Sequence, residues 1–153
     1  MAESNTANVN IFRIVTSVFL AILVGVLLWF AAPTGDTAVS ANNEGVVFNN
    51  NKQYEKAVEA FDRAIEMDPE FAMAYNNRGI VYGMKEEYYR AIDDFDKAIE
   101  LDPGLAIAYY NRSYANKFLS RNILAIADLE KCIQLSDDPK LVESARQLLD
   151  ELR

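Results

Sequence analysis

Hydrophobic and polar positions divide the 153-residue chain into two parts with different periods. Residues 14–32 form one continuous apolar run without a charge. From residue 38 onward, apolar residues instead recur every three or four positions, as in Ala57, Ala60, Phe61 and Ala64. This spacing places side chains along one face of an α-helix. The pattern therefore predicts one wholly apolar helix followed by a series of amphipathic helices.

The apolar run is long enough to cross a membrane. A helix rises about 1.5 Å per residue and the hydrocarbon core is about 30 Å thick, so roughly 20 residues span it. Arg13 lies near the start of the run, and Pro33, Gly35 and Asp36 follow its end. We therefore expect a polar tail at 1–10, a transmembrane anchor that binds the lipid bilayer at 11–32, and a short linker at 33–37.

Two alternatives concern this segment. A cleaved signal peptide, which would give a secreted protein, has a shorter apolar stretch of about 7–15 residues behind a basic start. Here Arg13 is the only basic residue of the start, which favours a retained anchor with the following domain on the extracytoplasmic side. Small residues every four positions allow transmembrane helices to approach closely, so Ser17, Ala21 and Gly25 are candidates for a homo-oligomer contact.

The remainder of the chain repeats itself with a constant period. The segment AFDRAIEMDP at residues 60–69 reappears as DFDKAIELDP at residues 94–103. The predicted units are 38–71, 72–105 and 106–139. Each unit contains two helical stretches, near 39–50 and 54–67 in the first. Pro69 and Pro103 end the second stretch, because a prolyl ring cannot continue a helix.

These units resemble the tetratricopeptide repeat, a helical hairpin of about 34 residues. The residues that match its pattern are small, aromatic or large apolar residues: Gly45, Gly79, Phe48, Tyr82, Tyr54, Tyr88, Ala57, Ala91, Ala125, Phe61, Phe95 and Leu129. The third unit departs from the pattern at Ser113, Asn116 and Asn122, so we expect it to pack more loosely. The resemblance implies an all-α, right-handed α-solenoid of three helix-turn-helix repeats. A capping helix at 140–153 closes it, with Asp138 as N-cap and Pro139 as the first helical residue.

In the family that the chain resembles, the first helices of successive units line a concave groove for a protein or peptide partner. The corresponding residues are Asn43, Asn77, Asn111, Met73, Ile80, Met84, Ile107, Tyr110, Tyr114 and Phe118. The asparagines can donate to and accept from a ligand's main chain, or they are a consensus feature without a ligand. The apolar residues fit an apolar or aromatic segment of a partner, or they pack between helices instead.

Family members that bind chaperone tails grip a terminal carboxylate with Lys and Arg at defined groove positions. Here Asn42, Ile107 and Asn111 occupy those positions, and Asn77 alone remains of that clamp. The resemblance therefore implies that this chain does not bind chaperone tails.

Composition narrows the function further. Glu3 and Arg13 cancel, so the part from Asp36 onward carries the whole formal net charge of −8, which excludes nucleic acid as a partner. The chain has no histidine, one cysteine (Cys132) and scattered glycines, so no catalytic site, metal site or cofactor is predicted. Asp93, Asp94 and Asp96 are clustered, but we expect them on a solvated helix face.

The sequence thus predicts a membrane-anchored protein–protein interaction scaffold without enzymatic activity. Its layout favours a role in assembling a membrane complex, by analogy of fold alone. The alternative is a structural subunit that self-associates through its anchor and its stack of repeats.

Overall fold

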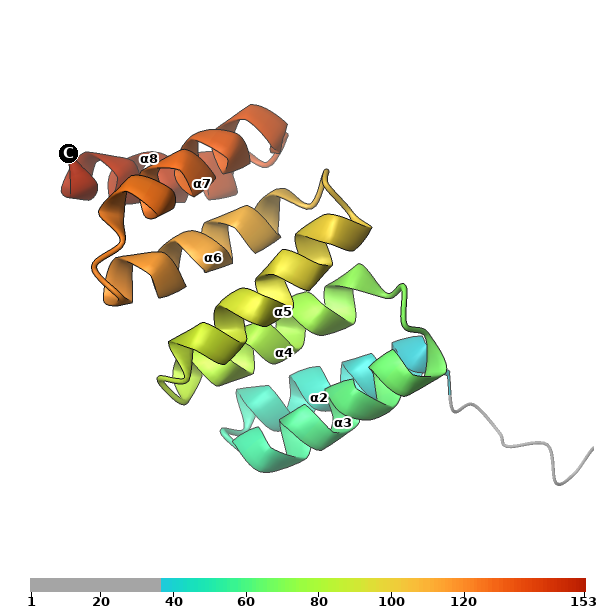
Figure 1. Ribbon diagram of the computed structural model, residues 1–153. Helices are drawn as coiled ribbons and strands as arrows, with labels where there is room; N and C mark the ends of the chain where they lie inside the picture. The colour runs from blue at the N-terminus through green and yellow to red at the C-terminus, as the bar shows by residue number, and fades with distance from the viewer. Residues whose placement is uncertain (1–36) are drawn as a thin grey trace, which may run out of the picture. The chain divides into compact units, whose positions relative to one another are not determined.

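The computed structural model describes residues 37–153, which form seven helices stacked as successive hairpins (Figure 1). The helices are α2 (Ala38–Asn50), α3 (Tyr54–Met67), α4 (Ala72–Met84), α5 (Tyr88–Leu101), α6 (Ala106–Phe118), α7 (Asn122–Leu135) and α8 (Pro139–Leu152). The second helix of each hairpin packs against the helix that follows it. The predicted all-α solenoid of three hairpins with a closing helix is therefore confirmed in this part of the chain.

The expectations for the N-terminal region lie outside the described residues. They concern the tail at 1–10, the anchor at 11–32, the linker up to residue 36, and the contact through Ser17, Ala21 and Gly25. Among residues 37–153, no helix has the length and apolar character needed to span a membrane.

The same tight turn joins the two helices of every hairpin. Lys52, Glu86 and Ser120 have φ angles of 58°, 61° and 58°, the left-handed conformation that commonly ends a helix. The residue after each of them donates its backbone N–H to a carbonyl in the last turn of the preceding helix, at 2.8–2.9 Å. These turns recur once in every repeat although none contains glycine. The second helices end at Met67 and Leu101, just before the Asp-Pro pairs, as predicted.

A small residue lies where the two helices of a hairpin cross. A Cβ atom built on Gly79 would lie 2.7 Å from the ring of Phe95, and one on Gly45 would lie 2.6 Å from the ring of Phe61. In the third hairpin, Ser113 is fully buried and Leu129 replaces the phenylalanine. The serine is therefore compatible with the close crossing because its partner is not aromatic.

The Gly79→Ser variant should lose about 1–3 kcal/mol of unfolding free energy, because its new side chain overlaps Phe95. Adding Phe95→Leu copies the natural pair of the third hairpin, so the double variant should lose less than the two single variants together. Denaturant titration of all three variants measures this coupling. Gly83→Ser is the control, because no atom lies within 4 Å of a Cβ at Gly83 and serine favours a helix more than glycine does. Additive losses would contradict the account.

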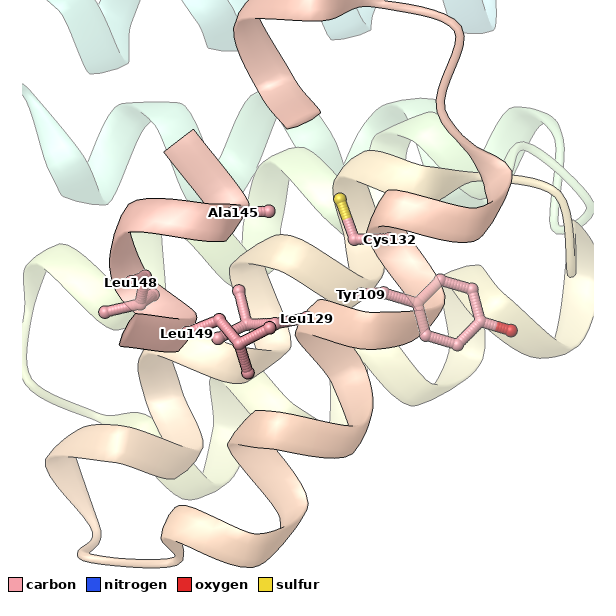
Figure 2. Packing of buried hydrophobic residues seen from close by; sticks show 6 residues of the cluster. All are labelled: Tyr109, Leu129, Cys132, Ala145, Leu148 and Leu149. Carbon is pink, nitrogen blue, oxygen red and sulfur yellow. The ribbon is translucent and has the colours of Figure 1, made fainter. Parts of the chain in front are cut away.

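The closing helix α8 covers the apolar end of the third hairpin. Its N-cap is Asp138, whose side chain accepts a hydrogen bond from Lys140 N at 2.9 Å, and Pro139 is the first helical residue. These two predictions are confirmed, and the helix begins at residue 139 rather than 140. Figure 2 shows the buried cluster formed by residues of α6, α7 and α8: Tyr109, Leu129, Cys132, Ala145, Leu148 and Leu149.

Two arginines connect neighbouring hairpins. The Arg78 guanidinium donates to both oxygens of Asp94 at 2.8 and 2.6 Å, and to Asp62 of the preceding hairpin at 2.5 Å. Asp94 is only 5% exposed, so the prediction of a solvated position for it was wrong. Because Asp94 is largely removed from water, it depends on Arg78 for charge compensation.

The third hairpin contains the same bridge. Arg112 donates to both oxygens of Asp128 at 3.0 and 2.6 Å, and to Asp96 of the preceding hairpin at 2.5 Å. Consecutive repeats are thus held together by charge-assisted hydrogen bonds as well as by apolar contact.

Candidate partner-binding groove

A cavity of about 320 Å³ lies among α4, α5 and α6, and we call it the groove pocket. Its walls are Ile80, Gly83, Met84, Tyr88, Phe95, Tyr110, Asn111, Tyr114, Ala115 and Phe118. The structure therefore brings six of the candidate residues together: Ile80, Met84, Tyr110, Asn111, Tyr114 and Phe118. The other four candidates, Asn43, Met73, Asn77 and Ile107, lie outside this pocket.

Aromatic pairs form much of the pocket wall. Tyr88 of α5 stacks on Phe118 of α6, with ring centroids 4.9 Å apart and an interplanar angle of 7°. Tyr110 and Tyr114 meet edge to face, with centroids 5.2 Å apart. Phe118 is nevertheless 61% exposed and Met84 62% exposed. Large apolar side chains left in contact with water on a concave surface are typical of protein-binding sites.

The groove pocket contains no formal charge. None of its lining residues is acidic or basic, and its polar groups are phenols and one amide. The Tyr110 hydroxyl lies 3.4 Å from that of Tyr114, and burial together with this contact raises the pKa of Tyr110 to about 12. Tyr110 is therefore neutral at physiological pH. Such a pocket favours an apolar or aromatic group over a charged one, which would lose its hydration without gaining a counter-ion.

The candidate asparagines connect neighbouring repeats. Asn77 Nδ2 donates to Asn42 Oδ1 at 2.9 Å, and Asn111 Nδ2 donates to Asn76 Oδ1 at 2.9 Å. Both acceptor residues are buried. One N–H of Asn77 and one of Asn111 are thus already used inside the protein. Asn43 belongs to α2, before which the described part of the chain has no further repeat, and it is exposed.

Met73 and Ile107 are the second residues of α4 and α6, and neither lines the pocket. Sequence reasoning missed Tyr88 and Phe95, which belong to α5. Both match the family's pattern, but neither was expected to line the groove. Gly83 is the signal that could have indicated them, because a glycine late in α4 leaves open space beside it: a Cβ atom built there would meet no atom within 4 Å.

Within the described part of the chain, no three His, Cys, Asp or Glu side chains come together in a way that could hold a metal ion. The arrangement offers shape, aromatic surface and a few uncharged hydrogen-bonding groups. Its chemistry is that of non-covalent recognition.

A stack of helical hairpins with an aromatic pocket defines a helical-repeat interaction scaffold. Models of the tetratricopeptide repeat match residues 72–105 and 106–139, and a further TPR repeat model matches residues 45–86. The sequence matches none of the curated proteins with which it was compared.

Solved structures give the same assignment. The second TPR of Spaghetti (RPAP3), bound to the HSP90 peptide SRMEEVD, is 31% identical with a TM-score of 0.64, and the match covers 66% of this chain and 94% of that one. The second TPR domain of human RPAP3, in complex with the HSP70 peptide SGPTIEEVD, is 30% identical with a TM-score of 0.68. The match covers 75% of this chain and 93% of that one. The TPR domain of Arabidopsis OM64 is 26% identical with a TM-score of 0.70, and the match covers 76% of this chain and 96% of that one. The chain belongs to the tetratricopeptide repeat family.

Proposed function

We propose that residues 37–153 act as a scaffold that binds a segment of a partner protein in the groove pocket. The observation that carries the proposal is the uncharged, largely aromatic wall that leaves Met84 and Phe118 more than half exposed. Related domains were solved with peptides bound, which supports a peptide or protein as ligand. The partner contributes an apolar or aromatic side chain that covers Phe118 and Met84. The scaffold itself catalyses no reaction.

The peptides held by the two RPAP3 domains end in the acidic sequence EEVD. The groove of this chain lacks the cations that such a sequence needs. Asn42 is buried and bonded to Asn77, Ile107 is apolar, and Asn111 is bonded to Asn76. The partner therefore belongs to a different class from the chaperone tails.

The peptide SRMEEVD should bind this chain at least about 100-fold more weakly than it binds a domain that has the carboxylate-gripping cations, since charge-assisted hydrogen bonds are lost. Isothermal titration calorimetry measures both affinities under the same salt conditions, with the second TPR of Spaghetti as the positive control. Comparable affinities for the two proteins would show that this groove accepts acidic tails.

Co-purification in mild detergent tests groove binding in the full chain. The groove variant combines Met84→Ala, Tyr114→Ala and Phe118→Ala, which shorten exposed side chains. The control variant combines Val47→Ala and Met67→Ala, which are also exposed but do not line the groove pocket. Circular dichroism checks that both variants keep their helix content. We expect the intact chain and the control to retain a partner that the groove variant loses. Equal retention by all three would place the interaction elsewhere.

We also propose that residues 11–32 anchor the scaffold in a membrane, with the repeats on the extracytoplasmic side, where it takes part in assembling a membrane complex. The support comes from the sequence: an uncharged run over residues 14–32 with Arg13 before it. The full chain should stay in the membrane fraction after extraction with alkaline carbonate, and protease added from outside should cleave the repeats in sealed cells. Release of the chain by carbonate would show that residues 11–32 do not anchor it in the membrane. Protection of the repeats from protease would show that they do not lie on the outer side.

A further inference from the structure

A second cavity, of about 380 Å³, lies in the third repeat, and we call it the third-repeat pocket. Residues of α5, α6 and α7 line it, together with Arg121 just before α7. Its lining residues are Ile92, Asp96, Arg112, Asn116, Arg121, Leu124, Ala127 and Asp128, and none of them belongs to the groove pocket. It is therefore a separate feature from the proposed partner site.

In the first two repeats, the corresponding place is occupied by an aromatic ring under a cation. The Lys56 ammonium lies 5.6 Å from the centre of the Phe48 ring. The Arg90 guanidinium lies 3.9 Å from the centre of the Tyr82 ring and donates to the Tyr82 hydroxyl at 2.6 Å. Glu87 accepts from Arg90 at 2.6 Å and holds it in place. A ring and a cation at these distances attract each other electrostatically.

The third repeat changes all three positions. Asn116 stands where Tyr82 stands one repeat earlier, Leu124 where Arg90 stands, and Arg121 where Glu87 stands. The small amide replaces the ring, so a cavity remains beside it. Arg121 forms no ion pair within residues 37–153, and its guanidinium lies 5.2 Å from the centre of the exposed Tyr89 ring. Two arginines line the pocket: Arg112 is already bonded to Asp96 and Asp128, whereas Arg121 has no acidic partner among the described residues. The aromatic ring of the first two repeats is missing here.

Asn116 contributes a buried amide to the wall of the third-repeat pocket. It is 3% exposed, and its Nδ2 donates to Asp128 Oδ2 at 3.2 Å. Its Oδ1 is buried and accepts no hydrogen bond from any described residue. Buried carbonyl oxygens of side-chain amides normally have a donor. Because this oxygen has almost no accessible surface, a ligand that fills the cavity and brings one donor would satisfy it once the Asn116 amide turns toward the ligand.

We propose that the third-repeat pocket binds a tyrosine side chain of a partner protein. The ring takes the position that Phe48 and Tyr82 hold in the first two repeats, against the apolar side chains of Ile92 and Leu124. Arg121 supplies the cation beside the ring, and the phenolic hydroxyl supplies the donor that Asn116 Oδ1 lacks. Ile123, which precedes Leu124 in the chain and is 84% exposed, offers apolar surface to the residues that flank the tyrosine. The partner thereby supplies the aromatic ring that the third repeat lacks at position 116.

The test uses N-acetyl-tyrosinamide as probe and the full chain, labelled with ¹⁵N, in detergent micelles. We expect saturable shifts of the Asn116 side-chain amide and of Arg121 at millimolar probe, and at least several-fold weaker binding of N-acetyl-phenylalaninamide, which lacks the hydroxyl. The variant Asn116→Phe with Leu124→Lys copies the Phe48–Lys56 pair of the first repeat and fills the pocket from within. This variant should lose the shifts and should unfold at a temperature no lower than that of the intact chain.

Several results would overturn the proposal. The first is the absence of shifts at Asn116 and Arg121, and the second is their persistence in the filled variant. The third is a marked fall in the unfolding temperature of the filled variant, because it would show that a ring has no room there. Equal binding of the phenylalanine and tyrosine probes would exclude the role of the hydroxyl and therefore the choice of tyrosine. Shifts confined to Tyr114 and Phe118 would assign the probe to the groove pocket instead.

Discussion

Replacing Arg78 by methionine is expected to lower the free energy of unfolding by about 3–5 kcal/mol, because it leaves the buried carboxylate of Asp94 without its counter-ion. Methionine keeps an unbranched side chain of similar reach, so the change tests charge more than volume. Denaturant titration at neutral pH measures the loss. Arg63→Met is the matched control, because Arg63 pairs with Glu44 in water and exposed pairs contribute less than about 1 kcal/mol.

The loss caused by Arg78→Met should depend on pH in a defined direction. Burial raises the pKa of Asp94, and the hydrogen bonds from Arg78 oppose that rise. Without Arg78, the pKa of Asp94 in the folded variant rises further, while in the unfolded chain it stays near its ordinary value. Protonation then removes the buried charge, so the loss is full at neutral pH and shrinks as the pH falls through the raised pKa. A loss that is the same at pH 7 and near pH 4 would contradict this explanation.

Deleting residues 138–153, which removes α8, should destabilise the chain by on the order of 5 kcal/mol, since it uncovers the apolar cluster that Leu148 and Leu149 complete. Cys132 reports the change directly because it is the only cysteine of the chain. In the intact chain its side chain is fully buried, and burial raises the pKa of its thiol to about 11. A disulfide reagent at pH 8 should therefore react very slowly with the intact chain and rapidly with the truncated one.

Gln147→Ala is the control for the deletion, because Gln147 is an exposed residue of α8 and alanine favours a helix. Its Cys132 should stay as protected as in the intact chain. If Cys132 remained protected after removal of α8, the closing helix would not be what buries the end of the third hairpin.

The hairpins could be predicted from the sequence because their determinants are local and repeated. Apolar spacing gives the helices, and the Asp-Pro pairs at Pro69 and Pro103 end them. Gly79 with Phe95 marks a helix crossing that Gly45 and Phe61 form in the preceding repeat. The N-cap at Asp138 depends on a bond to a residue in the next turn of chain. Rules of this short range do not require a three-dimensional structure.

The ion pairs between helices could not be predicted in the same way. Arg78 and Asp94 lie 16 residues apart on different helices, and periodicity alone does not say that their side chains meet. The recurrence of the same spacing at Arg112 and Asp128 was an available signal that sequence reasoning did not use. For that reason the expectation of a solvated Asp94 was wrong.

The groove was predicted in part. Family position identified the side chains of α4 and α6, but not how far along these helices a pocket would open. The pocket is confined to the region around Tyr110 and Phe118, so Met73 and Ile107 lie outside it. Tyr88 also lines the pocket, because its ring stacks on Phe118. This contact joins two hairpins and depends on the angle at which they pack.

The most direct test of partner binding in the groove is site-specific photo-crosslinking in the full chain. A photoreactive phenylalanine replaces Phe118, which is exposed in the groove pocket, or Met67, which is exposed outside it. We expect a crosslink to one partner protein from position 118 and none to that protein from position 67. A partner crosslinked from position 67 and not from position 118 would contradict the assignment of the groove pocket as the binding site.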